Sequence, residues 1–258
     1  MKITWKKFSI IFIWIASFLG TAGALEIGSS AEAINIAGKQ RMLSYRILKD
    51  YLMVSMESTY KNPKEDLAKA MRDFEEAQKA LVLYSKDQQV QTLTKEVEDA
   101  FNVIQKMVSQ PFDSSREEEY LQKATHMKAL SHGIVLRLQT LSGAKSAEIV
   151  NKSGRLRAVS QRMNALYLLK TLGVSSSVIQ NGMKASMKIF RDNLDFLQKS
   201  EPKDADIVKR LKKLEKIHLF FQIMLESDNH VPTIITKKSD KMLKYGDELT
   251  NIYVEKSK

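Results

Sequence analysis

Apolar residues recur every three or four positions from about residue 30 to the end of the chain. That spacing places them on one face of an α-helix. The clearest apolar stripes cover residues 67–84, 90–108, 179–197 and 207–225. No stretch shows sustained apolar and polar alternation bounded by turn signals, so we expect no β-strands. The pattern predicts an all-α protein.

Helix-breaking residues divide these stripes into two similar sets. Proline disfavours helical conformation in the residue before it and is well tolerated at the first helical position. The expected breaks in the first half are Asn62-Pro63, the polar segment 85–88 and residues 111–115. Those in the second half are residues 173–177, 202–204 and Pro232. Each half is therefore predicted to hold four helices, which suits an antiparallel four-helix bundle.

A sequence repeat supports this division into halves. Residues 34–54 and 150–170 align without a gap at a spacing of 116 residues. A repeat of this kind sets the architecture of a chain. We therefore expect one bundle in residues 25–143 and a second in residues 144–258. The shared positions are Asn35/Asn151, Gly38/Gly154, Arg41/Arg157, Ser44/Ser160, Arg46/Arg162, Tyr51/Tyr167 and Leu52/Leu168.

The junction between the two halves contains no proline. Gly143 is its only breaker, and one glycine costs a helix interior only about 1 kcal/mol. The last helix of the first bundle is therefore expected to continue into the first helix of the second. Such a long continuous helix would join the two tandem bundles into an elongated rod.

The N-terminus has the layout of a secretory signal peptide. Three lysines precede an apolar run over residues 8–19, and Ala22-Gly23-Ala24 follows the A-x-A cleavage pattern. The run is shorter than the ~20 residues that span a bilayer. We expect residues 1–24 to be removed and the protein to enter the periplasm, with an uncleaved membrane anchor as the alternative.

The amino-acid composition and the absence of known motifs limit the functions that we expect. The chain has no cysteine, and its four histidines have no metal-ligand spacing, so we expect neither a metal nor another cofactor. Phosphate-binding, nucleotide-binding and hydrolase motifs are absent, so an enzyme is not expected. The net charge of +11 is compatible with an anionic partner, but export argues against nucleic acid. The scattered lysines of residues 209–216 are most simply a solvated helix face.

The repeated motif N-x-x-G-x-x-R carries the candidate chemistry. At about 100° per residue, Asn35, Gly38, Arg41 and Tyr45 share one helix face. The glycine would let a ligand or a partner helix approach the backbone, and the arginine fork suits an oxyanion such as nitrate, carboxylate or phosphate. The second copy offers Asn151, Gly154 and Arg157, but Gln161 in place of the tyrosine. A packing glycine beside a solvated arginine is the alternative interpretation.

The phrase AGKQRMLSYR at residues 37–46 resembles the opening helix of the PilJ-type domain, the N-terminal sensor module of type IV pili chemotaxis transducers. It also resembles the periplasmic nitrate-sensing segment of the NarX family of histidine kinases. The second copy, SGRLRAVSQRM, is similar but looser. The resemblance implies nitrate or nitrite bound at a homodimer interface, where the first helices of two protomers meet. The implied contacts are Gly38 and Arg41, with Gly154 and Arg157 in the second copy.

The sequence thus predicts an exported periplasmic binding or sensor protein for a small oxyanion. The chain stops at Lys258, so we expect no signalling module of its own. A membrane histidine kinase or chemotaxis transducer would be its partner. The alternative function is a helical interaction module that docks such a partner without binding a ligand.

Overall fold

The computed structural model describes residues 25–174, 177–200, 204–226 and 231–258. These residues form eight α-helices and a short 3-10 turn, η1 (Ser114–Arg116), and no β-strand. The all-α prediction is confirmed. The predicted signal peptide and Pro202 lie outside the described residues. The helices of the first half are α1 (Ser30–Ser55), α2 (Pro63–Tyr84), α3 (Gln88–Val108) and α4 (Glu117–Ser142). Those of the second half are α5 (Lys145–Thr171), α6 (Ser177–Ser200), α7 (Ala205–Glu226) and α8 (Pro232–Glu255).

Local capping explains where several helices begin. Asn62 caps α2 by accepting a hydrogen bond from the backbone N–H of Glu65, and Pro63 takes the first helical position. The carboxylate of Asp87 caps α3 in the same way. Pro232 begins α8. The breaks at Pro63, at residues 85–88 and at Pro232 are therefore where the sequence predicts them.

The outer helices bury the stripes that their sequences predict. Each presents one apolar face to its own bundle and an exposed polar face to solvent, as expected for a surface helix. The buried side chains are Ala70, Phe74, Ala77 and Leu81 in α2, Val90, Val97, Phe101 and Ile104 in α3, Ile179, Phe190, Leu194 and Leu197 in α6, and Ile207, Leu211, Leu214 and Phe221 in α7.

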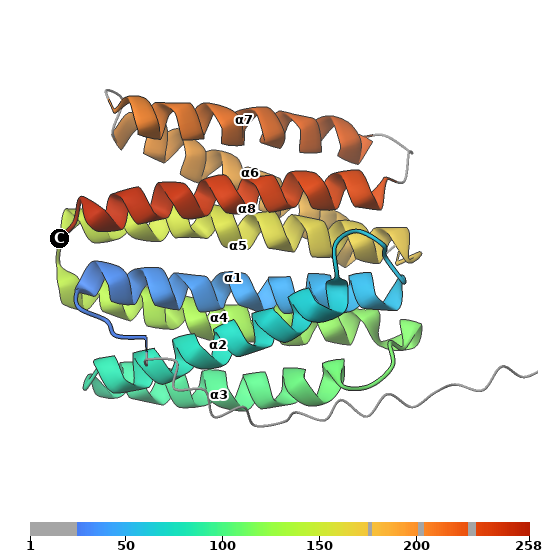
Figure 1. Ribbon diagram of the computed structural model, residues 1–258, viewed down its shortest axis with the longest axis horizontal. Coiled ribbons are helices and arrows are strands. Elements are labelled where there is room, and N and C mark those ends of the chain that lie inside the picture. Colours follow the sequence, from blue (N-terminus) through green and yellow to red (C-terminus); the bar gives the residue numbers. More distant parts are fainter. Residues whose placement is uncertain (1–24, 175–176, 201–203, 227–230) are drawn as a thin grey trace, which may run out of the picture.

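Each half of the chain is an antiparallel four-helix bundle (Figure 1). In the first half α1 packs against α2 and α4, and α3 packs against α2 and α4. The second half repeats these contacts, with α5 against α6 and α8, and α7 against α6 and α8.

The two bundles meet along α1 and α5, which lie side by side at the centre of the molecule with their own bundles on either side (Figure 1). This is the most extensive helix pairing in the described residues. Both helices are buried on nearly all sides. The buried apolar side chains of both halves form one continuous cluster.

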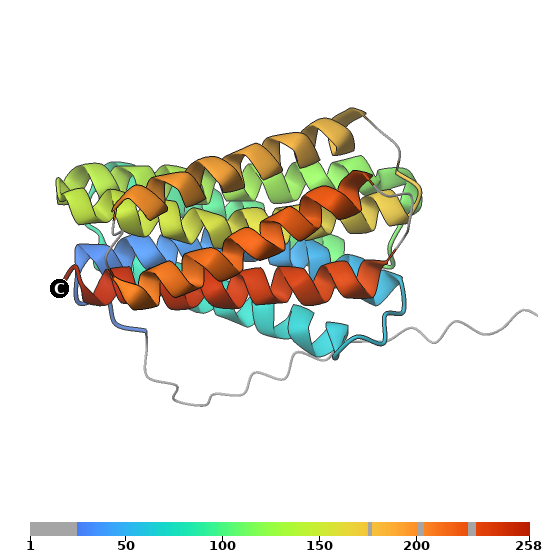
Figure 2. The ribbon, with the colours of Figure 1, turned by 90° about the horizontal axis from the view of Figure 1, so that it is seen from above.

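The predicted rod is wrong. Helix α4 ends at Ser142, Gly143 adopts a left-handed conformation with φ of 60°, and α5 begins at Lys145, so the chain reverses. Figure 2 shows the helices of both halves running alongside one another. End-to-end stacking would leave the facing sides of α1 and α5 in water. Burial of two long helix faces, at about 25 cal/mol per Å² of apolar surface, outweighs the small advantage of a continuous helix.

A buried arginine pair between α1 and α5

The side-by-side packing brings the two copies of the repeated motif together. Arg41 on α1 is fully buried, and Arg157 on α5 is 1% exposed. The Nη2 atoms of both arginines lie close to the same points: each is within 3.6 Å of the position that a Cβ would take at Gly38 and within 3.4 Å of that at Gly154. Two guanidinium groups from equivalent positions therefore face each other inside one chain.

Each arginine is held by the asparagine of the opposite copy. Arg41 donates from Nη1 to the side-chain oxygen of Asn151 at 2.9 Å and from Nη2 to its carbonyl oxygen at 3.2 Å. Arg157 donates from Nη2 to the side-chain oxygen of Asn35 at 2.7 Å and to its carbonyl oxygen at 3.4 Å. This exchange gives the site an approximate twofold symmetry. It also explains why asparagine recurs six residues before each arginine.

Both motif glycines lie beside the guanidinium groups, but only Gly154 makes room for them. A Cβ at Gly154 would lie 3.1 Å from Nη2 of Arg157 and 3.4 Å from Nη2 of Arg41. At Gly38 the corresponding distances are 3.5 and 3.6 Å. A Cβ at Gly38 would meet only ordinary van der Waals contacts, so the close approach of the arginine termini requires a glycine only at position 154.

The charges of the two arginines are balanced differently. Arg157 donates from Nη1 to the carboxylate of Asp247 on α8 at 2.6 Å. Arg41 instead contacts Nδ1 of His132 on α4 at 3.0 Å, and it has no carboxylate partner among the described residues. Because an unpaired charge is costly to bury, the charged form of Arg41 is less stable than that of Arg157.

Burial disfavours the positively charged forms of Arg41, His132 and Arg157. Burial, followed by the charges of Arg155 and Arg157, lowers the pKa of Arg41 to about 9. Burial and the charges of Arg41, Lys128 and Arg155 lower the pKa of His132 to about 3, so the imidazole is neutral at pH 7. Burial also lowers the pKa of Arg157, against the opposing effect of Asp247. The pKa shifts thus indicate an electropositive region that is shielded from solvent.

Tyr45 lies outside the arginine pair. Its hydroxyl shares a hydrogen bond with Thr125 at 3.2 Å, and the guanidinium of Arg162 lies 5.8 Å from the centre of its ring. The motif arginine Arg46 forms ion pairs with Asp50 and Asp66. Asn35, Gly38, Arg41, Asn151, Gly154 and Arg157 are thus brought together, whereas Tyr45, Arg46 and Arg162 are not part of the cluster.

The predicted pairing of first helices from two protomers is also wrong in its geometry. The motif face of α1 packs against α5 of the same chain, so that face cannot receive a second protomer. The pairing within one chain depends on the turn at Gly143, because a continuous helix would hold the two motif copies a bundle length apart. Formation of a homodimer itself stays a prediction.

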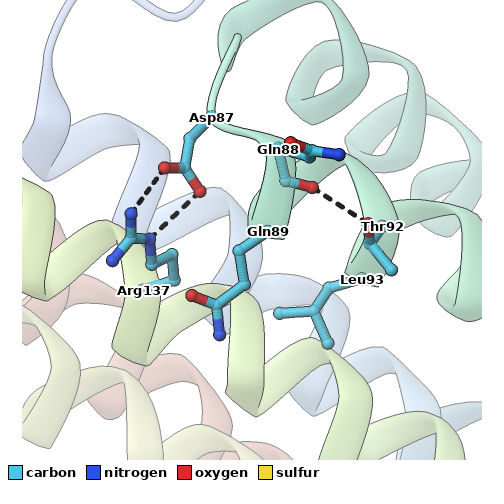
Figure 3. A pocket seen from close by; sticks show the side chains of 6 residues that line it. All are labelled: Asp87, Gln88, Gln89, Thr92, Leu93 and Arg137. Carbon is cyan, nitrogen blue, oxygen red and sulfur yellow. Dashed lines mark hydrogen bonds and ion pairs between the residues drawn. The ribbon is translucent and has the colours of Figure 1, made fainter.

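A surface hollow lies elsewhere, at the start of α3 (Figure 3). It is lined by Asp87, Gln88, Gln89, Thr92, Leu93 and Arg137. Arg137 is paired with Asp87 through two hydrogen bonds of 3.0 and 2.6 Å. Its charge is therefore compensated, and the hollow offers no free cation to an anion.

Sequence reasoning missed His132 and Asp247. Both come from the last helix of a bundle, far in sequence from the motif arginines that they contact. The repeat spacing aligns Asp247 with Ser131 and His132 with Glu248, so these partners differ between the two copies. A search for shared residues therefore cannot find them.

None of the helices in the described parts of the chain is both long enough and apolar enough to cross a bilayer. No curated protein and no solved structure matches the chain. Residues 26–130, which are most of the first bundle, match the family model described as PilJ, the N-terminal domain of type IV pili methyl-accepting chemotaxis transducers, so this part of the chain is similar to a chemotaxis transducer domain.

Proposed function

We propose that the chain binds one small planar oxyanion, nitrate or nitrite, between Arg41 and Arg157. The observation that carries this proposal is the fully buried guanidinium of Arg41, which faces a second guanidinium and has no carboxylate partner among the described residues. Exported to the periplasm, the protein would act as a sensor for this anion.

Simple electrostatics favours an anion between the two arginines. Two like unit charges roughly 6 Å apart repel by about 3 kcal/mol at an effective dielectric constant near 20. A single negative charge between them reverses the sign of the interaction. Each charge-assisted hydrogen bond to the anion adds about 1.5–3 kcal/mol.

The arginines also have donors that protein acceptors do not use. The Nε–H groups of Arg41 and Arg157 are buried and have no hydrogen-bond partner among the described residues. Planar guanidinium forks match the planar shape of nitrate and nitrite. Asn35 and Asn151 hold the two forks in facing positions before the ligand arrives, which reduces the ordering cost of binding.

The intramolecular pair makes one chain a complete binding unit. Ligand binding would tie α1 to α5 and so stabilise the contact between the two bundles. A membrane transducer or histidine kinase that contacts both bundles could read this change. The similarity of residues 26–130 to a chemotaxis transducer domain supports a role in that type of signalling.

Calorimetric titration of residues 25–258 with nitrate and nitrite in chloride-free buffer tests the proposal. We expect one anion per chain, and loss of saturable binding in both Arg41→Met and Arg157→Met. Arg72→Met, which removes an exposed charge from α2, is the matched control and should bind normally.

Three other outcomes would count against the proposal. A stoichiometry of one anion per two chains would restore the intermolecular site. Binding that survives both arginine substitutions would place the ligand elsewhere. No heat with either anion would favour the docking module that binds no ligand.

A further inference from the structure

A second cluster of positive charge lies on the flank of the molecule between α4 and α5. Lys128 and His132 are one helical turn apart on α4, so they share a face, and Arg155 projects from α5 toward the ring of His132. All three side chains are partly exposed. Lys128 and Arg155 form no ion pair with a carboxylate in the described residues, in contrast to Arg137 on the same helix as Lys128.

The imidazole of His132 cannot accept hydrogen bonds from both of the arginines that it contacts. Nδ1 lies 3.0 Å from Nη1 of Arg41, and Nε2 lies 3.5 Å from Nη2 of Arg155. A neutral imidazole has one acceptor nitrogen and one N–H. One of the two arginines must therefore face an N–H group, whichever tautomer forms. An acceptor placed between Arg155 and the ring would resolve this conflict.

The charge balance points to the same conclusion. Lys128 faces Arg41, Arg155 and Arg162, and burial together with these like charges lowers its pKa to about 8. The charges that face His132 come from α1 (Arg41), α4 (Lys128) and α5 (Arg155), and all three are positive.

We propose that Lys128, His132 and Arg155 form a second anion site, on the α4–α5 flank, for an oxyanion that carries two charges, such as sulfate or hydrogen phosphate. The partial exposure of the three residues lets such an ion keep part of its hydration, which the buried arginine pair does not allow. Several uncompensated cations favour a dianion over nitrate. The flank site goes beyond the proposed nitrate site and does not depend on it.

Calorimetric titration of residues 25–258 with sulfate and with phosphate at pH 7 tests this site. Each charge-assisted hydrogen bond removed should weaken binding about tenfold, so Lys128→Met combined with Arg155→Met should weaken it about a hundredfold. The matched control is Lys123→Met combined with Lys145→Met. It removes the same charge from exposed positions on α4 and α5 and should bind like the unaltered protein.

Arg157→Met separates the two sites. It should abolish nitrate binding and leave sulfate binding within about twofold, because Arg157 contacts neither Lys128, His132 nor Arg155. Sulfate binding lost in Arg157→Met would mean that the dianion occupies the arginine pair, and the flank proposal would fall. Equal weakening in the control double variant would also overturn it, since the effect would then be one of net charge.

A phosphorylated headgroup on a membrane offers the same chemistry as free phosphate. Sedimentation with phosphatidylglycerol vesicles distinguishes the two sources. We expect the protein to bind the free ions and not to sediment with the vesicles. The three side chains lie between helices, where a headgroup fixed in a membrane cannot reach them. Vesicle binding without binding of free sulfate or phosphate would overturn the small-ion site.

Discussion

Arg41 and Arg157 stand at equivalent positions of the repeat, and their Nη2 atoms lie 3.4 and 3.1 Å from the same point, the Cβ position at Gly154. Two copies of one motif thus meet within a single chain, as the two halves of a dimer would. Their different partners, His132 for Arg41 and Asp247 for Arg157, make the pair chemically unequal. The following predictions depend on this arrangement.

The two motif glycines should respond differently to alanine. Gly154→Ala places a methyl group 3.1 Å from Nη2 of Arg157, so the guanidinium must move by a few tenths of an ångström and nitrate affinity should fall about tenfold or more. Gly38→Ala meets only ordinary contacts of 3.5 and 3.6 Å. It should bind nearly normally and gain up to about 1 kcal/mol of helix stability. Calorimetry and urea unfolding of both variants measure these effects, and a larger affinity loss in Gly38→Ala would contradict the geometry.

His132 should destabilise the folded protein in acid. Its pKa of about 3 in the folded state lies below its ordinary value of 6.5, so between these pH values only the unfolded chain takes up this proton. The contribution of His132 to the free energy of unfolding is therefore complete above pH 6.5 and decreases as the pH falls toward 3. His132→Gln should lose less stability than the unaltered protein between pH 7 and pH 4.

Urea unfolding at the two pH values measures that difference. His126→Gln is the control, because His126 is exposed on the same helix. Identical pH dependence of His132→Gln and the unaltered protein would show that the imidazole is not held neutral by its cationic neighbours.

Lys49 and Asp50 form a buried ion pair that the second copy of the repeat lacks. Their side chains are 4% and 1% exposed, and Nζ of Lys49 lies 2.6 Å from Oδ1 of Asp50. The equivalent positions are Ala165 and Leu166. Lys49→Ala leaves the buried Asp50 with only the longer contact to Arg46 at 3.4 Å, and Asp50→Leu leaves the buried Lys49 with only Asp240 at 3.8 Å. Each single variant should therefore cost up to about 3–5 kcal/mol.

The double variant Lys49→Ala, Asp50→Leu should cost much less than the sum of the two single variants, because it leaves neither member of the pair stranded. Chemical unfolding of the four proteins completes the double-mutant cycle. Additive losses would show that the two side chains do not depend on each other.

The first bundle alone should associate with itself. Residues 25–143 leave the face of α1 that carries Gly38 and Arg41 without α5, and at about 100° per residue that face includes the buried apolar residues Ile34 and Met42. A second copy of α1 is the surface most like the missing partner. Light scattering should report a dimer of this fragment, whereas residues 25–258 should not dimerise through α1. A stable monomeric fragment would show that the α1–α5 contact contributes little.

Much of the local structure follows from the sequence because its causes are local. Phe74, Phe101 and Phe190 fall on helical stripes, and each is buried where its stripe predicts. Pro63 and Pro232 begin helices because a proline lacks the N–H that an interior helical position needs. The spacing of Asn35, Gly38 and Arg41 likewise fixes their common face, and the structure uses that face for one cluster.

The relationship between the two bundles was decided only by the tertiary structure. Gly143 is compatible with a continued helix or with a turn, and the difference in local free energy is about 1 kcal/mol. The choice depends on the surface that α1 and α5 bury against each other, which involves residues more than a hundred positions apart. The sequence by itself identified Arg41 and Arg157 as the candidate arginines, because their shared motif can be read along the chain. Only the packing of α1, α4, α5 and α8 decided that Arg41 faces Arg157, and that His132 and Asp247 are their partners.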